Sequence, residues 1–478
     1  MNFHVVAYVL GCLIALLGAF QLPTVLVALL YREPWWPYAA TAAIGIGAGA
    51  ALALAIRSDD WRLHPREGFL IVAAGWVLAS VFGALPYVLT GALGPVDAFF
   101  EAVSGFTTTG STVLSGLESR PRGLLLWRSF TQWIGGMGII LFTIALLPLL
   151  GIGGMQLFKA EVPGPVKDKI RPRLVETARE LWVIYVGLTV AECGALLLAG
   201  MPPFEAVCHS FTTLATGGFS TRDLSVGAFG SPAIEWVVTV FMMLAGVNFV
   251  LHYRLLHGRL AEVARDAELR YFVGVVGGAV ALLAVPLVLG AYGVGDGMRA
   301  AAFQAVSIAT TTGYVTADFE VWPHFTQLVL LVLMVLGGMS GSTAGGVKSL
   351  RVVLSIRTLR VWSERLLHPS VVRSVKYAGR PVELDVLAGV WAFLTAYALI
   401  AAAAAAVLAA LGYDLPTAFS AALTALGNVG PGLGAVGAYD NFAHLPALGK
   451  LVLAFCMLAG RLEVFALLML ALPQFWRR

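Results

Sequence analysis

Long apolar runs separated by short polar segments dominate this chain. A helix that crosses a bilayer needs about 20 mostly apolar residues, and ten runs are candidates for such helices. They are Val5–Leu30, Ala39–Ile56, Gly68–Leu89, Leu124–Ile152, Leu181–Leu198, Ala233–Tyr253, Tyr271–Leu289, Gln327–Leu336, Val386–Leu411 and Lys450–Leu472. The eighth run is too short to cross by itself. The first lacks a basic start and a small-residue cleavage site, so we interpret it as a retained helix.

Four short, glycine-ended segments recur between these runs, at intervals of roughly a hundred residues. They are Thr108-Thr109-Gly110, Thr216-Gly217-Gly218, Thr311-Thr312-Gly313 and Asn428-Val429-Gly430. The first and third also share Phe-x-Ala-Val-Ser at the same offset, beginning at Phe100 and Phe303. We call them the predicted filter segments, because four copies of one loop can surround an axis and aim backbone carbonyls at it.

This repetition predicts an all-α polytopic membrane protein with internal fourfold repetition. Each repeat is expected to hold a helix, a short pore helix of about ten residues that dips into the membrane, and a second helix. The four parallel repeats would surround one central pore, with two extra helices at the N-terminus. The expected units are a helix pair (1–60) and four repeats (61–155, 156–262, 263–357 and 358–478).

The predicted pore helices give the filter its preference for cations. A helix C-terminus carries about half a negative elementary charge, and four such ends would point at the axis. Glycine adopts the left-handed conformations that turn a carbonyl inward, and it leaves room for an ion. Glycines also simply end helices, which is the plainer interpretation. Four of them at matching positions favour the filter.

The third repeat contains a run of small residues, Gly337–Gly346, that would make a poor helix inside a membrane span. Irregular backbone at membrane depth is tolerated only where protein or water covers it. We therefore predict a gating loop below the filter. Its expected gating residues are Gly337, Gly338, Gly341, Ser342, Thr343, Gly345, Gly346 and Lys348. The stretch Gly341–Lys348 also nearly spells a phosphate-binding loop, but it follows an apolar run and has one residue too many.

Arg461 lies in the middle of the last apolar run, within Leu453–Leu472. A charge at the bilayer centre costs between about 2.5 and more than 10 kcal/mol, so it needs a specific partner. No helix end is expected near it, and Glu463 projects from a different face of the predicted helix. We expect Arg461 to face a wet cavity under the filter, to contact the carbonyls or hydroxyls of Gly337–Gly346, and to form the gate with them.

Composition and charge narrow the class of protein. Hydrophobic residues make up 59% of the chain and charged residues 12%, about half the charged share of a soluble protein. Basic residues crowd into Arg57–Arg66, Lys159–Arg179, Arg254–Arg270 and Lys348–Arg380, which places these loops and both termini in the cytoplasm and the filter segments outside. Topology explains these basic clusters better than nucleic-acid binding does. The four cysteines show no disulfide or zinc spacing, and no catalytic motif is present.

At its motifs the chain resembles the membrane subunit of Trk-type potassium uptake systems, in the superfamily that includes Ktr and plant HKT transporters. The motifs are Ser104–Gly110, Gln132–Gly138, Ala215–Ser220, Gly341–Lys348 and Gly427–Gly434. The resemblance implies potassium held by filter carbonyls, an intramembrane gating loop, a homodimer with one pore per protomer, and a separate cytosolic ring of nucleotide-binding regulatory subunits. It also implies a protein embedded in lipid in the cytoplasmic membrane.

The resemblance bears on the choice of ion as well. In plant relatives a serine at the first filter glycine accompanies sodium permeation, whereas Gly110 and its three counterparts are glycine here. That pattern favours potassium, and no covalent or organic cofactor is expected. Gly217-Gly218 departs from the other segments and leaves the coordinating carbonyl of repeat two open. The alternative is an ion-coupled secondary transporter of a small solute, but those commonly use inverted repeats.

Overall fold

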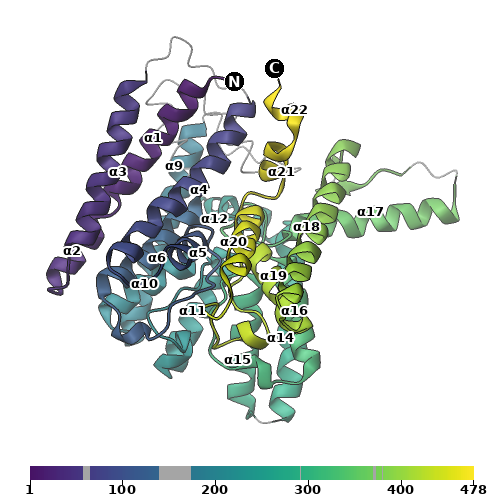
Figure 1. The fold of residues 1–478 in the computed structure, drawn as a ribbon. Coiled ribbons are helices and arrows are strands. Elements are labelled where there is room, and N and C mark those ends of the chain that lie inside the picture. Colours follow the sequence, from purple (N-terminus) through teal and green to yellow (C-terminus); the bar gives the residue numbers. More distant parts are fainter. Residues whose placement is uncertain (57–64, 139–173, 291, 370–372, 379, 478) are drawn as a thin grey trace.

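The computed structural model describes residues 1–56, 65–138, 174–290, 292–369, 373–378 and 380–477, and this part of the chain is mostly helical (Figure 1). The helices are α1 (Phe3–Ala19), α2 (Leu22–Leu30), α3 (Trp36–Ala55), α4 (Pro65–Leu89), α5 (Pro95–Phe106), α6 (Arg122–Met137), α9 (Leu174–Leu198), α10 (Pro203–Leu214), α11 (Pro232–Ala245), α12 (Phe249–Leu256), α13 (Leu260–Ala264), α14 (Ala267–Leu289), α15 (Val294–Ala309), α16 (His324–Leu336), α17 (Ser349–Leu367), α18 (Leu384–Ala410), α19 (Leu415–Gly427), α20 (Ala447–Arg461), α21 (Phe465–Ala471) and α22 (Pro473–Trp476). One antiparallel pair of short strands, β1 (Lys376–Tyr377) and β2 (Arg380–Pro381), follows α17.

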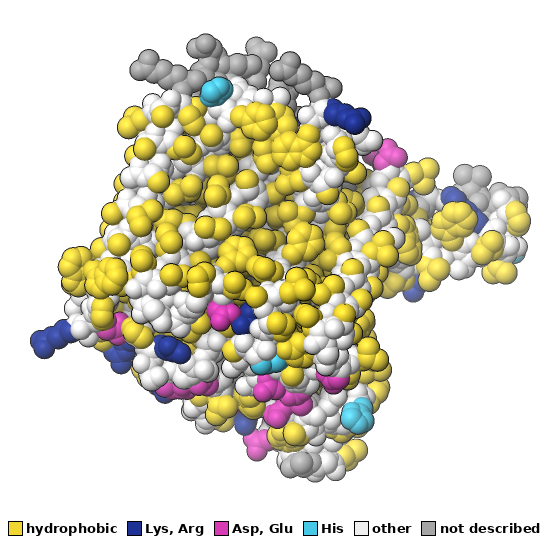
Figure 2. All heavy atoms as spheres, in the orientation of Figure 1, with side chains coloured by type: hydrophobic (Ala, Val, Ile, Leu, Met, Phe, Trp, Pro, Cys, Tyr) yellow, Lys and Arg dark blue, Asp and Glu magenta, His cyan; other side chains and the backbone are white. Residues whose placement is uncertain are grey.

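Six helical spans among the described residues are long and apolar enough to cross a membrane, or eight if two bent helix pairs each count as one. The six are Phe3–Leu30, Trp36–Ala55, Arg66–Leu89, Ala178–Leu198, Ala267–Leu289 and Leu384–Ala410. Figure 2 shows apolar side chains covering the middle of one face, with acidic side chains gathered toward its lower end. The chain is therefore a multi-pass membrane protein. The predicted run Leu124–Ile152 extends beyond the described residues.

Two helices that the sequence predicted to be continuous are broken. The run Ala233–Tyr253 divides into α11 and α12, which are bent by 99°, and Lys450–Leu472 divides into α20 and α21, bent by 114°. At the second break Glu463 and Val464 both have positive φ, which ends the regular helix. The break after Gln327–Leu336 was predicted and is present, since α16 ends at Leu336.

Four short helices, α5, α10, α15 and α19, immediately precede the predicted filter segments and contain 12, 12, 16 and 13 residues. Proline stands at the first turn of α5, α10 and α19, where its missing N–H costs nothing. Each short helix packs against the long helix before it, namely α4, α9, α14 and α18. Each also packs against the outgoing helix of another unit: α5 on α20, α10 on α6, α15 on α11 and α19 on α16.

Glycines permit the close approach of these outgoing helices to the short ones. A Cβ at Gly246, just past α11, would lie 2.7 Å from Thr310, just past α15, and one at Gly136 of α6 would lie 2.7 Å from the backbone of Ala215. Gly460 of α20 approaches the carbonyl of Leu426 in α19, the short helix of its own unit. Small residues at such contacts let helix backbones approach closely. Two large hydrophobic clusters lie around the short helices, and α17 projects from the body (Figure 1).

Candidate functional site

The four predicted filter segments share one backbone conformation. The first residue of each is left-handed and the last is a glycine with positive φ. The first residues are Thr108 (φ 55°), Thr216 (53°), Thr311 (56°) and Asn428 (54°), and the glycines are Gly110 (85°), Gly218 (75°), Gly313 (76°) and Gly430 (113°). A left-handed threonine is uncommon and persists only where its surroundings enforce it. Gly217 therefore occupies the middle position in the second segment. The sequence Thr216-Gly217-Gly218 can accordingly be aligned with the other three segments, residue by residue.

A common helix cap produces this conformation. In each segment the N–H of the middle residue donates to the carbonyl five residues earlier in the short helix, as in a Schellman cap. The bonds are Thr109 to Ser104 (2.9 Å), Gly217 to Thr212 (2.8 Å), Thr312 to Ser307 (2.9 Å) and Val429 to Thr424 (3.0 Å). The carbonyl of the same middle residue lies close to a glycine of another segment.

The glycines and the middle carbonyls form a closed cycle of contacts. An added Cβ at any of the four glycines would lie less than 3.0 Å from the middle carbonyl oxygen of another segment. The pairs are Gly110 with Gly217 O, Gly218 with Thr312 O, Gly313 with Val429 O, and Gly430 with Thr109 O. Each segment contacts the next one along the chain, and the fourth contacts the first. Segments that are far apart in the sequence therefore lie close together. All twelve predicted metal-site residues belong to this cycle of segments.

Hydroxyl and amide groups tie the segments to their neighbours. The Thr107 and Thr109 hydroxyls lie 2.8 Å apart, and those of Thr310 and Thr312 repeat this pair at the same distance. Asn428 Nδ2 donates to Thr109 Oγ1 and to Met457 O, both at 2.9 Å, so the fourth segment is linked to the first.

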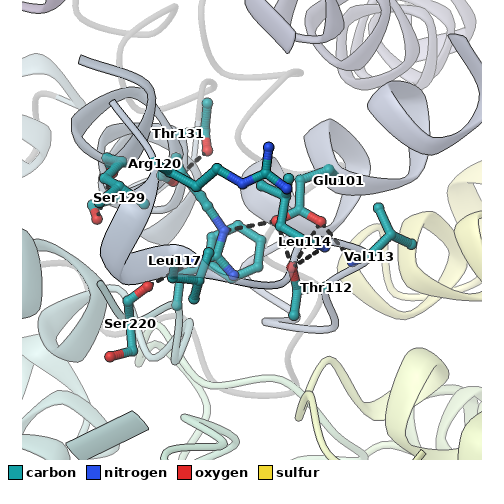
Figure 3. Close-up of polar contacts among 12 residues, drawn as sticks. Glu101, Thr112, Val113, Leu114, Leu117, Arg120, Ser129, Thr131 and Ser220 are labelled. Atoms are coloured by element: carbon teal, nitrogen blue, oxygen red, sulfur yellow. Dashed lines mark hydrogen bonds and ion pairs between the residues drawn. The ribbon is translucent and has the colours of Figure 1, made fainter. Parts of the chain in front are cut away.

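Behind the first segment lies a buried ion pair. Arg128 Nε lies 2.7 Å from Glu101 Oε1, and their side chains are 3% and 0% exposed. The Glu101 carboxylate also accepts bonds from Thr112 Oγ1 and Val113 N, as Figure 3 shows. Arg128 further donates to Ser220 O at 2.6 Å and lies over the Phe219 ring. The pair thus joins α5 to the chain that follows both the first and the second predicted filter segments.

This pair was not predicted from the sequence. Arg128 falls within the predicted run Leu124–Ile152, and in the structure it is buried within α6. The available signal was a charged residue inside a predicted span, together with Glu101 within the Phe-x-Ala-Val-Ser motif. In the second unit, His209 of α10 lies in a comparable place and its Nε2 is 3.0 Å from Ser220 Oγ.

The predicted gating loop contacts the segments directly. Thr343 Oγ1 donates to the carbonyls of Leu214 (3.0 Å) and Ala245 (3.2 Å), and Gly345 N donates to Thr311 Oγ1 at 2.7 Å. A Cβ at Gly345 would also lie within 3.0 Å of Gly427 O. The loop is therefore seated against the helix ends of the second, third and fourth units. It follows a helix and not a strand, which is not the context of a phosphate-binding loop.

Arg461 connects the loop to the first unit. Its Nη1 donates to Thr343 O at 2.8 Å, and its Nη2 donates to the carbonyls of Gly136 (2.9 Å) and Gly135. The expected contact with the carbonyls of Gly337–Gly346 is present. The expectation that no helix end lies near Arg461 was wrong, because α20 ends at this residue. The apolar composition of the run concealed the break.

Charged residues at both ends of the loop were not predicted as a group. Glu268 at the start of α14 accepts bonds from Ser340 N (2.7 Å), within the loop, and from Leu350 N (3.1 Å), just after it. Lys348 Nζ donates to Ala344 O within the loop. Just beyond, Arg351 of α17 forms an ion pair with Glu463, which lies at the break after α20. The loop, α14, α17 and the α20–α21 break are thereby one connected polar network.

Glu320 forms a hydrogen bond with the chain that follows the fourth predicted filter segment. Its Oε1 accepts a bond from Gly434 N at 2.6 Å. Burial raises the pKa of the Glu320 carboxyl above its ordinary value, the bond from Gly434 opposes this rise, and Asp318 and Asp440 add to it.

Within the described residues, no group of three or more His, Cys, Asp or Glu side chains could hold a metal ion. The oxygens of the four segments belong to the backbone, to threonine hydroxyls and to the Asn428 amide.

Comparisons with known proteins agree with this architecture. The sequence model of the family described as "TrkH: Cation transport protein" matches residues 38–478. Two "Trk system potassium uptake protein TrkH" sequences, from Salmonella typhimurium and Escherichia coli K12, are 44% and 43% identical, and each alignment covers 100% of both chains. The crystal structure of the potassium transporter TrkH from Vibrio parahaemolyticus is 39% identical, with a TM-score of 0.89 and 100% of both chains covered.

The fold is that of a multi-pass helical membrane transport protein. Within that class, the chain belongs to the TrkH family of cation transport proteins. The resemblance drawn from the sequence motifs is confirmed.

Proposed function

We propose that this protein takes up potassium across the cytoplasmic membrane through a channel-like pore. The closed cycle of four glycines and four middle carbonyls supports this proposal most directly. In this proposal the four repeats surround one axis, and the carbonyls of the twelve filter residues replace the hydration shell of the ion. The C-terminal ends of α5, α10, α15 and α19 add negative potential that favours a cation.

Potassium is the proposed ion for two reasons. The similar proteins from Salmonella typhimurium and Escherichia coli are named potassium uptake proteins. All four filter segments also end in glycine, so no filter hydroxyl replaces a backbone ligand at that position. The membrane potential supplies about 2.3 kcal/mol per charge for each 100 mV, which drives inward movement of a cation without an organic cofactor.

The loop and Arg461 form the proposed gate. The bonds from Thr343 and Gly345 hold the loop against the filter, and Arg461 places a positive charge between the loop and α6. Backbone packed in this position obstructs the path, and the guanidinium repels a passing cation. Conduction in this proposal requires the loop to leave the helix ends of the second to fourth units.

The setting of the proposed pore follows from charge and from the family. The N- and C-termini lie at the same end of the molecule (Figure 1), which fits the proposed cytoplasmic location of both. The basic segment Arg254–Arg270 has exposed residues, among them Arg259, and suits docking of a cytosolic nucleotide-binding regulatory subunit. We further propose a homodimer surrounded by lipid, with one pore in each protomer.

Ion flux in liposomes tests the proposed function. Purified protein is reconstituted, and uptake of potassium, sodium and choline is measured under an imposed inside-negative potential, for the wild type and for Arg461→Ala. We expect potassium uptake above that of protein-free vesicles and little choline uptake. Since a closed gate alone could silence the wild type, the proposal fails if neither protein carries potassium although both are inserted and folded.

A further inference from the structure

One buried side chain contacts the second predicted filter segment from the helix of another unit. Gln132 of α6 is fully buried. Its Nε2 donates to Gly217 O at 2.6 Å, and its Oε1 accepts a bond from Phe219 N at 3.0 Å. A single amide therefore holds the backbone on both sides of Gly218. Gly217 O is also the oxygen against which Gly110 packs.

The absence of a side chain at Gly217 is explained by this amide. A Cβ on Gly217 would lie less than 3.0 Å from the Cδ, Oε1 and Nε2 atoms of Gln132. The other three segments carry β-branched residues at the middle position, Thr109, Thr312 and Val429. The second segment thus has an amide from a neighbouring helix in the space that a side chain of its own occupies elsewhere.

The outgoing helices of the other units lack a comparable amide. Gln132 lies three residues before the small pair Gly135-Gly136. The residues three positions before the corresponding small pairs are Met242, Met334 and Cys456. None of these side chains can donate an N–H. Gln132 and Gly217 therefore form a matched pair that is particular to the second unit.

We propose that Gln132 is a positioning residue that fixes the second quarter of the filter and contributes to discrimination between potassium and sodium. The inference rests on the proposed function and deepens it. A carbonyl oxygen has two lone pairs, so Gly217 O accepts the amide proton and still faces an ion. The bond to Phe219 N prevents the peptide units around Gly218 from rotating. A filter quarter held in this way keeps its oxygen at the spacing that the larger ion requires, whereas a free one could close around sodium.

The test is the potassium-to-sodium permeability ratio of Gln132 variants in the same liposomes. Gln132→Met introduces the residue found at this position in α11 and α16 and removes both bonds. Gln132→Glu keeps nearly the same shape and the acceptor for Phe219 N but loses the donor to Gly217 O. We expect each to lower the ratio by roughly threefold to tenfold, the range set by losing one or two hydrogen bonds. Potassium flux should persist.

Two further variants separate positioning from packing. Gln304 of α15 is equally buried, and within the described part of the chain its amide has no hydrogen-bond partner, so Gln304→Met is the matched control. It should leave the ratio unchanged. The double variant Gln132→Met, Gly217→Thr gives the second unit the side-chain pair of Met242 and Thr312. It should recover at least part of the ratio that Gln132→Met loses.

The outcomes are distinct. A wild-type ratio in folded, conducting Gln132→Met and Gln132→Glu overturns the inference, as does an equal loss in Gln304→Met. Misfolding of both Gln132 variants, with Gln304→Met intact, would assign Gln132 a purely structural role and also overturn it. If the wild type and Arg461→Ala carry no potassium, the proposed function fails first and the inference falls with it.

Discussion

At the scale of single residues, each filter glycine is constrained twice. Its positive φ disfavours any residue with a Cβ, and the neighbouring carbonyl occupies the position that a Cβ would take. The two constraints have separate origins. The first comes from the cap of the glycine's own helix, and the second comes from another unit. A substitution at one glycine therefore disturbs two segments together.

Gly313→Ala should abolish most transport. The left-handed backbone costs alanine about 1–2 kcal/mol, and the added methyl must displace Val429 O, so we expect potassium flux to fall about tenfold or more. The matched control is Gly91→Ala, at a glycine with φ of +68° and open space around it. Flux through Gly313→Ala equal to that of Gly91→Ala would contradict the packing argument. The measurement is potassium uptake by liposomes at equal protein content.

Glu101→Ala should strongly destabilise the protein, because it leaves the Arg128 charge buried without its carboxylate partner. Such a loss costs about 3–5 kcal/mol. The thermal midpoint of the detergent-solubilised protein, followed by size-exclusion fluorescence, reports it. Glu364→Ala breaks an exposed ion pair with Arg373 and should cost less than about 1 kcal/mol. Similar midpoints for the two variants would refute the structural role assigned to Glu101.

Some of these residues could be predicted from the sequence, but their contact partners could not. The shared glycine position of the four predicted filter segments could be recognised from the sequence, because it recurs at matching offsets. The carbonyl that each glycine meets was not predictable, since it belongs to another segment, and for Gly430 that segment lies at the opposite end of the series of repeats. Likewise, the pairing of Arg128 with Glu101 depends on the packing of α5 against α6, which the local pattern does not specify.

At the scale of elements, breaks in the outgoing helices bring polar groups close to the predicted filter segments. The helices α11, α16 and α20 all end where the loop or its contacts lie. A helix end inside the protein exposes backbone groups that need partners. The carbonyl of Ala245, the last residue of α11, accepts a bond from Thr343, which is one such partner. Arg461 at the end of α20 provides partners for carbonyls of the loop and of α6.

Arg461→Ala should raise potassium flux. The change removes charged hydrogen bonds to Thr343 O and Gly136 O, each worth about 1.5–3 kcal/mol, and so favours release of the loop. We expect an increase of about tenfold or more, measured as initial uptake in liposomes. Lys450→Ala is the control on the same helix, because its ammonium pairs with Asp97 at 2.6 Å, away from the loop. An unaltered rate in Arg461→Ala would exclude the proposed gate.

The breaks were only partly foreseeable. The run Gly337–Gly346, small residues apart from Met339, predicted the interruption after α16, since glycine and serine propagate helices poorly. The bends of 99° and 114° occur within runs that remain apolar on both sides. Hydropathy measures how strongly a run prefers an apolar environment, but it does not report whether the helix is straight or bent. The predictions of continuous helices over Ala233–Tyr253 and Lys450–Leu472 were wrong for that reason.

At the scale of the whole molecule, the packing of helices is cyclic. Each short helix contacts the outgoing helix of the unit before it in the chain, and α5 of the first contacts α20 of the last. Contacts of this kind fix the relative order of the units. The chain's two ends lie at the same end of the molecule (Figure 1).

The proposed orientation is testable by cysteine labelling. In a background whose four cysteines are replaced by alanine, a single cysteine is introduced at Ala228 or at Ala261, both exposed. A membrane-impermeant maleimide added to intact cells should label Ala228→Cys, which follows the second filter segment. It should label Ala261→Cys, within the basic segment Arg254–Arg270, only after the cells are opened. The reverse pattern would invert the proposed topology.

Family membership and the multi-pass helical fold could be predicted from the motifs and from the apolar runs. What the sequence could not supply was the geometry between units. Gly217 illustrates this, since in the sequence it is only a departure from its counterparts. In three dimensions its missing side chain is accounted for by Gln132, which comes from another unit and lies 85 residues earlier.

The four filter segments belong to one polypeptide, which frees them from the identity that a tetramer of equal subunits would impose. In the proposed filter, a single codon change replaces a residue in one segment only, whereas in such a tetramer it would replace the residue in all four. The four segments can therefore be changed one at a time, in evolution or by mutagenesis. The threonines at the first position of three segments and Asn428 at the fourth show that such divergence has already occurred.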